Sequence, residues 1–504
     1  MKAILVLIDS LNREFLKAYN PDTWAITPNL DAFAGESTNF EKHFVGSTPC
    51  MPARRDMMTG RLNFLERNWG PLEPFDNCMT RIMRNNGIFS HIVTDHPHYM
   101  EPGGEGYLQG FQTWDYVRGQ EWDPWVSRVT PAPMPQQYYG QFFAEYQWNR
   151  TRFTSDEQFP SPICFQNAAQ WLRDNQGEDN FFMQVEVFSP HEPFNAPKEF
   201  LDLYGDDYEG LPFETSTYRE VTEPPEAIEH LRKKYASGLT MVDKWFGKFM
   251  DTVKELELYD DTLIIVTTDH GHLLGDHGYT GKNYMHQYNR IANIPMFVRM
   301  PGCNLMQVDE ITQNIDLMPT LLEYFGIPIP ERVQGASILP LLKGETVYAH
   351  KFALYGTFGG TVNLFDGRYT YHRAPVDETN SPLYYYTAMP VTLMKYLGID
   401  CENQIEMGGF LKHTNFPVYK IPAGFPIMQL KSTGPFKDTL LFDWENDWKQ
   451  ECVLTEKELH KTMAQKLKDA MEWAQSPDDQ FVRLGLSDDG DKSGIQERKD
   501  TDEE

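Results

Sequence analysis

Three short stretches of the chain are mainly apolar and are followed by polar residues. They cover residues 2–8, 180–188 and 263–268 and are rich in aliphatic, β-branched or aromatic side chains. Such runs are typical of strands buried on both faces of a parallel sheet. By contrast, residues 225–256 repeat apolar side chains with a helical period. This pattern predicts a long helix that covers one face of the sheet.

The polar residues after these runs are candidates for chemistry. Asp9 and Ser10 follow the first run, His191 comes shortly after the second, and Asp269 and His270 follow the third. Ligand sites in open α/β sheets lie at the carboxyl ends of the strands, so we expect these side chains at one edge. Carboxylates and imidazoles can together bind a metal ion. Taken alone, Asp and Ser have a plainer interpretation, because they also begin turns and helices.

The chain length predicts more than one domain. With 504 residues, the chain exceeds one ordinary core, so we expect a large domain and a smaller one. Residues 1–345 are predicted to form an α/β fold in which helices sandwich a large mixed, mostly parallel sheet. Residues 346–486 change to separate strands with a final helix and predict a smaller C-terminal α+β domain. Residues 487–504 are charged and predict a flexible tail.

Charge and cysteine use narrow the range of functions. The formal net charge is -28 at pH 7, whereas nucleic acids and anionic membranes require a positive surface. We therefore expect no nucleic acid or membrane partner, and a small monoanionic substrate is favoured over a long polyanion. The sequence has no apolar run near the ~18 residues that cross a bilayer and no secretory signal. Together with six scattered cysteines, this predicts a cytoplasmic protein.

A short motif carries the strongest chemical signal. Residues 50–54 read Cys-Met-Pro-Ala-Arg, and Thr59-Gly60 follows. The motif resembles the Cys-x-Pro-x-Arg signature of formylglycine-dependent sulfatases in the alkaline phosphatase superfamily. Other segments resemble that family in order over residues 1–345, including Asp269-His270-Gly271 and Gly275-Asp276-His277-Gly278 with Lys282. The resemblance implies an alkaline phosphatase-like fold.

The resemblance also implies a nucleophile and its helpers. Cys50 would be converted to formylglycine by a formylglycine-generating enzyme that acts on the unfolded chain, and the hydrated aldehyde would attack sulfur. Arg54 would stabilise this nucleophile by charge-assisted hydrogen bonds. His191 and Lys282 would neutralise the leaving oxygen and the transferred group. We expect the motif to lie on a loop outside the core.

One divalent metal ion is implied as well. Its ligands would be Asp9, Cys50, Asp269 and His270. The family usually has a second aspartate where this chain has Ser10, so only Asp9 is carried over at that position. Calcium is the family's usual ion. Manganese is the alternative, because an imidazole suits softer ions better than calcium.

One segment departs from the common sulfatase pattern, and another resembles a related branch. Residues 94–99 read Thr-Asp-His-Pro-His-Tyr where most sulfatases have Gly-Lys-Trp-His. His96 and His98 are predicted to replace the missing lysine, because imidazoles can still donate to an oxyanion; otherwise they are turn residues around a proline. Asn68 lies where the related phosphonate monoester hydrolases carry an active-site asparagine, and a plain turn residue is its alternative. The irregular residues 101–160 are expected to build pocket walls.

These features predict metal-dependent hydrolysis of small-molecule sulfate monoesters. The alternative is a phosphonate monoester hydrolase or phosphodiesterase, because the Asp269-His270 pair and the lost lysine are shared with that branch. A non-catalytic binding protein is a more distant possibility; it predicts loss of Cys50 or Asp269, and both are present. A homodimer is expected only from the general frequency of two-fold assemblies.

Overall fold

The computed structural model describes residues 1–345, 350–393, 395–398, 401–423 and 438–487. Within these residues, the largest sheet has eight strands in the order β13-β2-β12-β9-β1-β7-β5-β6. The strands are β1 (Lys2–Ile8), β2 (Thr38–Phe40), β5 (Phe89–Thr94), β6 (Thr113–Tyr116), β7 (Phe181–Val187), β9 (Thr262–Thr267), β12 (Met296–Arg299) and β13 (Gln307–Val308). Only β12 runs antiparallel to its neighbours. The predicted mixed, mostly parallel sheet is therefore confirmed.

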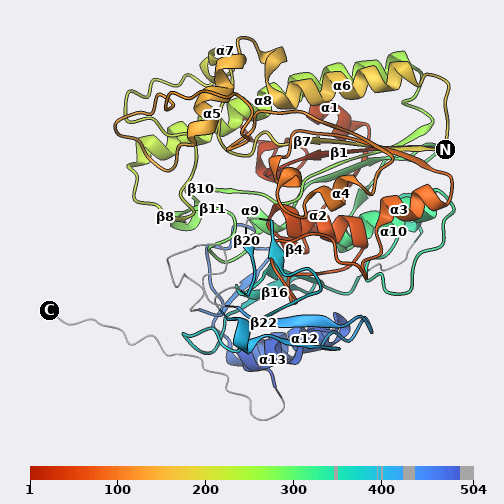
Figure 1. The fold of residues 1–504 in the computed structure, drawn as a ribbon, viewed down its shortest axis with the longest axis vertical. Helices are drawn as coiled ribbons and strands as arrows, with labels where there is room; N and C mark the ends of the chain where they lie inside the picture. Colours follow the sequence, from red (N-terminus) through yellow and green to blue (C-terminus); the bar gives the residue numbers. More distant parts are fainter. Residues whose placement is uncertain (346–349, 394, 399–400, 424–437, 488–504) are drawn as a thin grey trace.

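Helices cover both faces of this sheet (Figure 1). The first layer contains α1 (Pro28–Gly35), α6 (Pro160–Asp174) and α8 (Pro225–Glu255), and the second contains α2 (Cys50–Thr59), α3 (Met79–Asn85) and α10 (Leu317–Tyr324). Side chains alternate along a strand, so Ile4, Val6 and Ile8 of β1 pack against the first layer. Ala3, Leu5 and Leu7 pack against the second. This burial on both faces explains the unbroken apolar run in β1.

The strand ends beside β1 lie at the same level. Ile8 is paired with Val187 of β7, and Leu7 is paired with Thr267 of β9. The backbone N–H of Asp9 extends the ladder by donating to the Val187 carbonyl at 2.9 Å. Residues that follow β1, β7 and β9 therefore meet at one edge of the sheet.

A second sheet is formed mainly by the C-terminal part of the chain. It has the order β23-β17-β16-β15-β4, and its strands are β4 (Ser47–Thr48), β15 (Ala353–Thr357), β16 (Val362–Phe365), β17 (Tyr369–Arg373) and β23 (Leu440–Asp443). Helix α12 (Lys457–Trp473) packs against this sheet. The contribution of β4 was not predicted, and it ties the residues just before Cys50 to the C-terminal region.

The structure does not test the predicted domain limits or the predicted tail. The domain limits 1–345 and 346–486 stay predictions, and the predicted tail lies outside the described residues from position 488 on. In the part of the chain that the structure describes, no helix combines the length and the apolar character needed to cross a membrane.

Candidate active site

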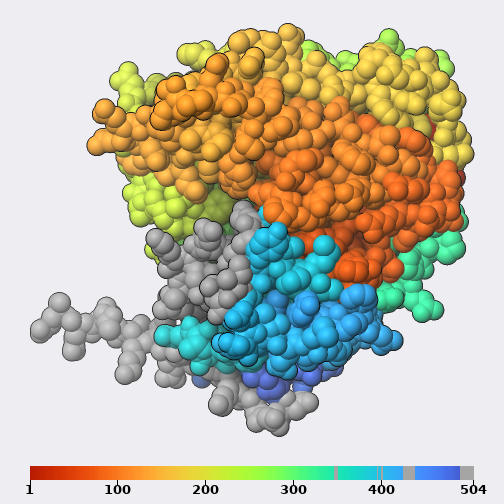
Figure 2. All heavy atoms as spheres, in the orientation of Figure 1, coloured from red at the N-terminus to blue at the C-terminus, as the bar shows by residue number. Residues whose placement is uncertain are grey.

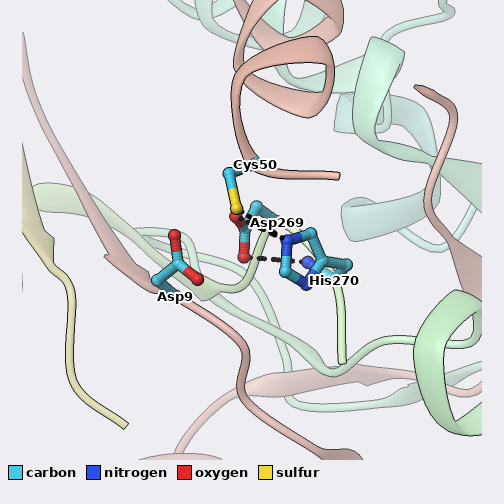
Figure 3. A group of neighbouring side chains, drawn as sticks. All are labelled: Asp9, Cys50, Asp269 and His270. Carbon is cyan, nitrogen blue, oxygen red and sulfur yellow. Dashed lines mark hydrogen bonds and ion pairs between the residues drawn. The ribbon is translucent and has the colours of Figure 1, made fainter. Parts of the chain in front are cut away.

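Four side chains from separate parts of the sequence converge at the sheet edge (Figure 3). The ligand atoms of Asp9, Cys50, Asp269 and His270 all lie within 4.8 Å of one another, and all four residues are buried. Asp9 follows β1, Asp269 and His270 follow β9, and Cys50 begins α2. The structure thus brings together the four residues that were predicted to bind a metal ion.

Cys50 does not lie on a loop, contrary to the expectation. It is the first residue of α2, is 1% exposed and packs within the second apolar layer. Pro49 and Pro52 lie on either side of Cys50 in the sequence, and a proline in the interior of a helix would break it. However, proline is tolerated in the first turn of a helix, where backbone N–H groups have no partner within the helix. Pro49 precedes the helix, and Pro52 lies in its first turn.

Arg54 connects three buried carboxylates. One turn after Cys50 on α2, its Nη2 donates to Oδ2 of Asp9 at 2.8 Å and its Nη1 to Oδ2 of Asp269 at 2.7 Å. Its Nε donates to Oε1 of Glu186 at 2.9 Å. One guanidinium thus faces three carboxylates, and the sum of these formal charges is minus two. Sequence reasoning missed Glu186, although an acidic residue inside a buried strand was a signal.

His270 is oriented as a metal ligand would be. Its Nδ1–H donates to the Gly271 carbonyl at 2.9 Å, so Nε2 carries the lone pair. Nε2 lies 3.2 Å from Sγ of Cys50 and 3.2 Å from Oδ2 of Asp269. Burial lowers the pKa of His270 to about 3, so its ring is neutral. A neutral imidazole fixed by its other nitrogen, beside carboxylates with excess negative charge, fits a divalent cation.

The three acidic groups of the site differ in protonation. Burial, and then the neighbouring Asp269, raises the pKa of Asp9. Burial also opposes ionisation of Asp269, but the charged Arg54 and Lys282 beside it help to hold the pKa of Asp269 well below its usual value. Burial raises the pKa of the Cys50 thiol well above its usual range. An unmodified thiol at this position is therefore protonated and a weak nucleophile.

Ser10 links the two aspartates and a lysine. Its backbone N–H donates to Oδ1 of Asp269 at 3.0 Å, and its hydroxyl donates to Oδ1 of Asp9 at 2.8 Å. Nζ of Lys282 donates to the same hydroxyl at 3.3 Å. Burial alone would lower the pKa of Lys282, but the acidic groups around it raise the value, so the ammonium is charged. The predicted lysine therefore lies beside the metal-site carboxylates.

His96 and His98 have different surroundings. Nδ1 of His96 accepts from the His98 backbone N–H at 3.3 Å, so its Nε2 carries a hydrogen. This Nε2 lies 3.6 Å from Oδ2 of Asp9 and has no hydrogen-bond partner within the described residues. Burial, with help from Arg54, lowers the pKa of His96, so it is a neutral donor. His98 instead lies 3.1 Å from Oε2 of Glu101.

The other two predicted residues are also buried. Nδ1 of His191 donates to the Glu192 carbonyl at 2.6 Å, and the His191 ring stacks on Phe188 with centroids 4.0 Å apart. This bond leaves Nε2 of His191 available for proton exchange. Asn68 is 4% exposed, and its Oδ1 has no hydrogen-bond partner in the described part of the chain. Within the described residues, no hydrogen bond connects the Asn68 side chain to the carboxylates of Asp9 and Asp269.

Comparison with known proteins agrees with the motif and the fold. The sequence profile of the family described as Sulfatase matches residues 2–327. The chain belongs to the sulfatase family. A choline-sulfatase from Rhizobium meliloti is 23% identical over 407 residues, covering 74% of this chain and 78% of the relative. An arylsulfatase from Clostridium perfringens is 22% identical over 400 residues, covering 68% and 78%.

Solved structures extend the likeness to most of this sulfatase-family chain. The phosphonate monoester hydrolase of Agrobacterium radiobacter has a TM-score of 0.66 and 18% identity, and the match covers 94% of this chain and 96% of that one. At this identity the match shows the fold alone. The predicted alkaline phosphatase-like architecture is therefore confirmed.

The irregular residues 101–160, here called the loop region, help to line a cavity in this sulfatase-family protein. Residues in the orange part of the colour bar, around positions 100 to 150, cover a broad area of the face in Figure 2. Some of them line a cavity of about 480 Å³ with residues of α8, including Met134, Phe142, Arg150 and Lys234. None of the four metal-site residues lines that cavity.

Two glutamates, one of them in the loop region, approach the histidines that were predicted to be catalytic. Glu121 contacts His98 and His191, and Glu192 contacts His191 and His272. Sequence reasoning missed three of these residues. The positions of Glu192, next to His191, and of His272, two residues after His270, were usable signals. Nothing in the surrounding sequence distinguished Glu121.

Proposed function

We propose that this chain hydrolyses sulfate monoesters of small molecules with a nucleophile made from Cys50. The observation that carries the proposal is the convergence of Cys50 with Asp9, Asp269 and His270 within 4.8 Å. These four residues would hold one divalent ion, calcium or, because of the imidazole, manganese. Such an ion would polarise the transferred group and favour a deprotonated nucleophile.

The protein's own residues would orient and stabilise the reacting groups. Cys50 as formylglycine would supply a geminal diol. Arg54 holds the start of α2 through its bond to the Cys50 carbonyl at 3.0 Å, and it fixes two metal-site carboxylates. The charged Lys282 would stabilise negative charge on the transferred group. Nε2 of His191, which carries a lone pair in the neutral ring, would take up a proton and pass it to the leaving oxygen. His96 would add a neutral N–H donor on the side of Asp9.

A second candidate function is hydrolysis of phosphonate monoesters or phosphodiesters. The observations that favour it are the imidazole of His270 in the metal site and the histidine-containing segment at residues 94–99. The fold likeness to a phosphonate monoester hydrolase is compatible with either reaction. A cytoplasmic location, a homodimer and modification by a formylglycine-generating enzyme stay predictions.

The nucleophile is tested with Cys50→Ala and a matched control, Cys164→Ala. We expect Cys50→Ala to lower turnover by at least ~10⁴-fold, equivalent to ~5.5 kcal/mol of barrier, with the fold kept. Cys164 is buried in the first apolar layer, so its replacement should lower stability slightly and leave turnover per folded molecule unchanged. Mass spectrometry of the active enzyme should show an aldehyde at position 50. A fully active protein with only free thiol there would overturn the proposal.

A further inference from the structure

A carboxyl group that the proposed reaction does not use lies beside the catalytic side chains. Glu121 is 3% exposed and lies between β6 and α5 (Ala144–Asn149). Its Oε1 lies 3.8 Å from Nδ1 of His191, and its Oε2 lies 3.6 Å from Nε2 of His98. Within the described residues, this Oε2 has no hydrogen-bond partner. A buried carboxylate oxygen without a partner is unfavourable, which points to a group that binds there.

Two other carboxyl groups border Glu121. Oε2 of Glu192 lies 3.2 Å from Nε2 of His272, and Oε2 of Glu101 lies 3.1 Å from Nδ1 of His98. Neither oxygen has a hydrogen-bond partner in the part of the chain that the structure describes. Among the described residues, only histidines lie within ion-pair distance of the three carboxyl groups, and the ammonium of Lys282 acts on Glu121 and Glu192 from farther away. We call Glu101, Glu121 and Glu192 the acidic cluster.

Aromatic side chains connect the acidic cluster to the protein surface. Nε1 of Trp122 donates to Oε1 of Glu101 at 3.2 Å, and the hydroxyl of Tyr218 donates to Glu192. Trp122, Tyr218 and Glu101 are only half-buried, so the cluster borders solvent. Aromatic faces near carboxylates attract organic cations, because the ring quadrupole and the negative charge act in the same direction.

The acidic cluster is adjacent to the reaction centre but distinct from the metal site. His191, the proposed proton donor to the leaving oxygen, lies between Glu121 and Glu192. The Tyr218 ring lies 5.9 Å from Nζ of Lys282. Among the described residues, only the Asp9 group is compact enough to hold a metal ion. The cluster is therefore placed to meet the alcohol half of a substrate and not a second metal ion.

We propose that the acidic cluster binds a positively charged nitrogen on the alcohol half of the substrate. The proposal rests on the proposed hydrolysis of sulfate esters and names the class of alcohol. A cation would pair with the unpartnered carboxylate oxygens, whereas a neutral alcohol would leave them desolvated and unpaired. In support, burial and then Glu192 raise the pKa of Glu121 well above its usual range. A bound cation would favour the ionised form.

Two pairs of esters isolate the effect of the charge. Choline O-sulfate and 3,3-dimethylbutyl sulfate differ only in a nitrogen cation replaced by carbon. The second pair, 2-aminoethyl sulfate and propyl sulfate, is smaller because it lacks the three methyl groups. It tests the effect of the same charge in case the methyl groups of the first pair are too large for the site. For the wild-type protein, we expect kcat/KM of the cationic ester to exceed that of its neutral partner at least about 30-fold in one pair or both.

The variant Glu121→Gln keeps the side-chain shape and removes the charge. Its cationic-to-neutral ratio should fall at least tenfold, and Glu121→Asp should restore part of it. Glu105→Gln removes an exposed charge from the same part of the chain and should leave the ratio unchanged. Thermal unfolding of each variant shows whether it is folded.

The outcomes separate this inference from the proposed function. If both sulfate esters of each pair react equally well, or if Glu121→Gln keeps the wild-type ratio, the cation site is wrong and sulfate hydrolysis stands. If no sulfate ester reacts but a phosphonate monoester does, the proposed function is wrong. In that case, calorimetry tests the cation site by measuring the affinities of choline and 3,3-dimethylbutanol for the wild-type protein and for Glu121→Gln. Choline binding that is tighter than that of 3,3-dimethylbutanol and that depends on Glu121 supports the site. Equal affinities for the two alcohols overturn it.

Discussion

The two sides of the active site differ in how completely the protein satisfies its own polar groups. One side holds Asp9, Asp269 and His270, and we call it the metal side. There, Arg54 makes three ion pairs of 2.7–2.9 Å, and Ser10 donates to both aspartates. The other side holds the acidic cluster, and we call it the alcohol side. There, oxygens of Glu121 and Glu192 have no hydrogen-bond partner in the described structure. The first side is preorganised and lacks only compensation for its charge, whereas the second needs a ligand to complete its contacts.

The largest expected effect comes from the metal side. Asp269→Asn removes a charged ligand and should weaken metal binding and lower turnover by about 10³-fold, or ~4 kcal/mol of barrier. Chelation of the wild-type enzyme should also inactivate it. Asp251→Asn, an exposed change on α8, is the control and should do neither. Metal analysis and kinetics on the same samples test this, and an Asp269→Asn protein that keeps its metal and its rate would exclude direct ligation.

Arg54 tests whether the metal side is preorganised by charge. Arg54→Gln leaves three buried carboxylates without their shared cation, so the free energy of unfolding of metal-free protein should fall by ~3–5 kcal/mol. Arg173, in an exposed pair with Glu255, is the control. Arg173→Gln should change stability by less than ~1 kcal/mol. Urea unfolding compares the two, and similar small losses would mean that Arg54 does not organise this side.

The two sides also differ in how well sequence predicts them. Asp9 and Asp269 were found because each follows an apolar strand, and parallel strands bring their carboxyl ends to one edge. Cys50 and Arg54 were found because they belong to a motif that resembles a family signature, although the helix that carries them was expected to be a loop. Glu121 was missed, because its position depends on a loop whose path no periodic pattern encodes.

The two histidines of residues 94–99 contact different sides of the active site, so they can test the difference between the metal side and the alcohol side. His96 faces Asp9, so His96→Ala should lower kcat/KM for all sulfate esters by about tenfold, or ~1.4 kcal/mol. His98 contacts Glu101 and Glu121. His98→Ala should therefore change the ratio of kcat/KM between cationic and neutral esters more than it lowers kcat/KM for both kinds of ester. Kinetics with matched ester pairs distinguish the two. A larger common loss in His98→Ala than in His96→Ala would reverse the assignment.

A smaller effect is expected outside both sides. Nε2 of His350 lies 2.6 Å from Oδ1 of Asp316, and although burial opposes it, Asp316 raises the pKa of His350. The pair should stabilise the fold fully below the unfolded pKa of ~6.5, and this stability should be lost as pH rises through the higher folded value. His350→Gln should remove ~1–3 kcal/mol at low pH and less at high pH. Unfolding curves across pH measure this, and a pH-independent loss would contradict the ion pair.

The central claim is that the reaction is sulfate monoester hydrolysis. The most direct measurement compares kcat/KM for 4-nitrophenyl sulfate, a 4-nitrophenyl phosphonate monoester and a 4-nitrophenyl phosphodiester, which share one leaving group. The enzyme should be metal-loaded, with its aldehyde content at position 50 measured. We predict that the sulfate is preferred by at least about tenfold, or ~1.4 kcal/mol of barrier. A phosphonate or phosphodiester that reacts faster than the sulfate would contradict the claim and assign the site to the second candidate function.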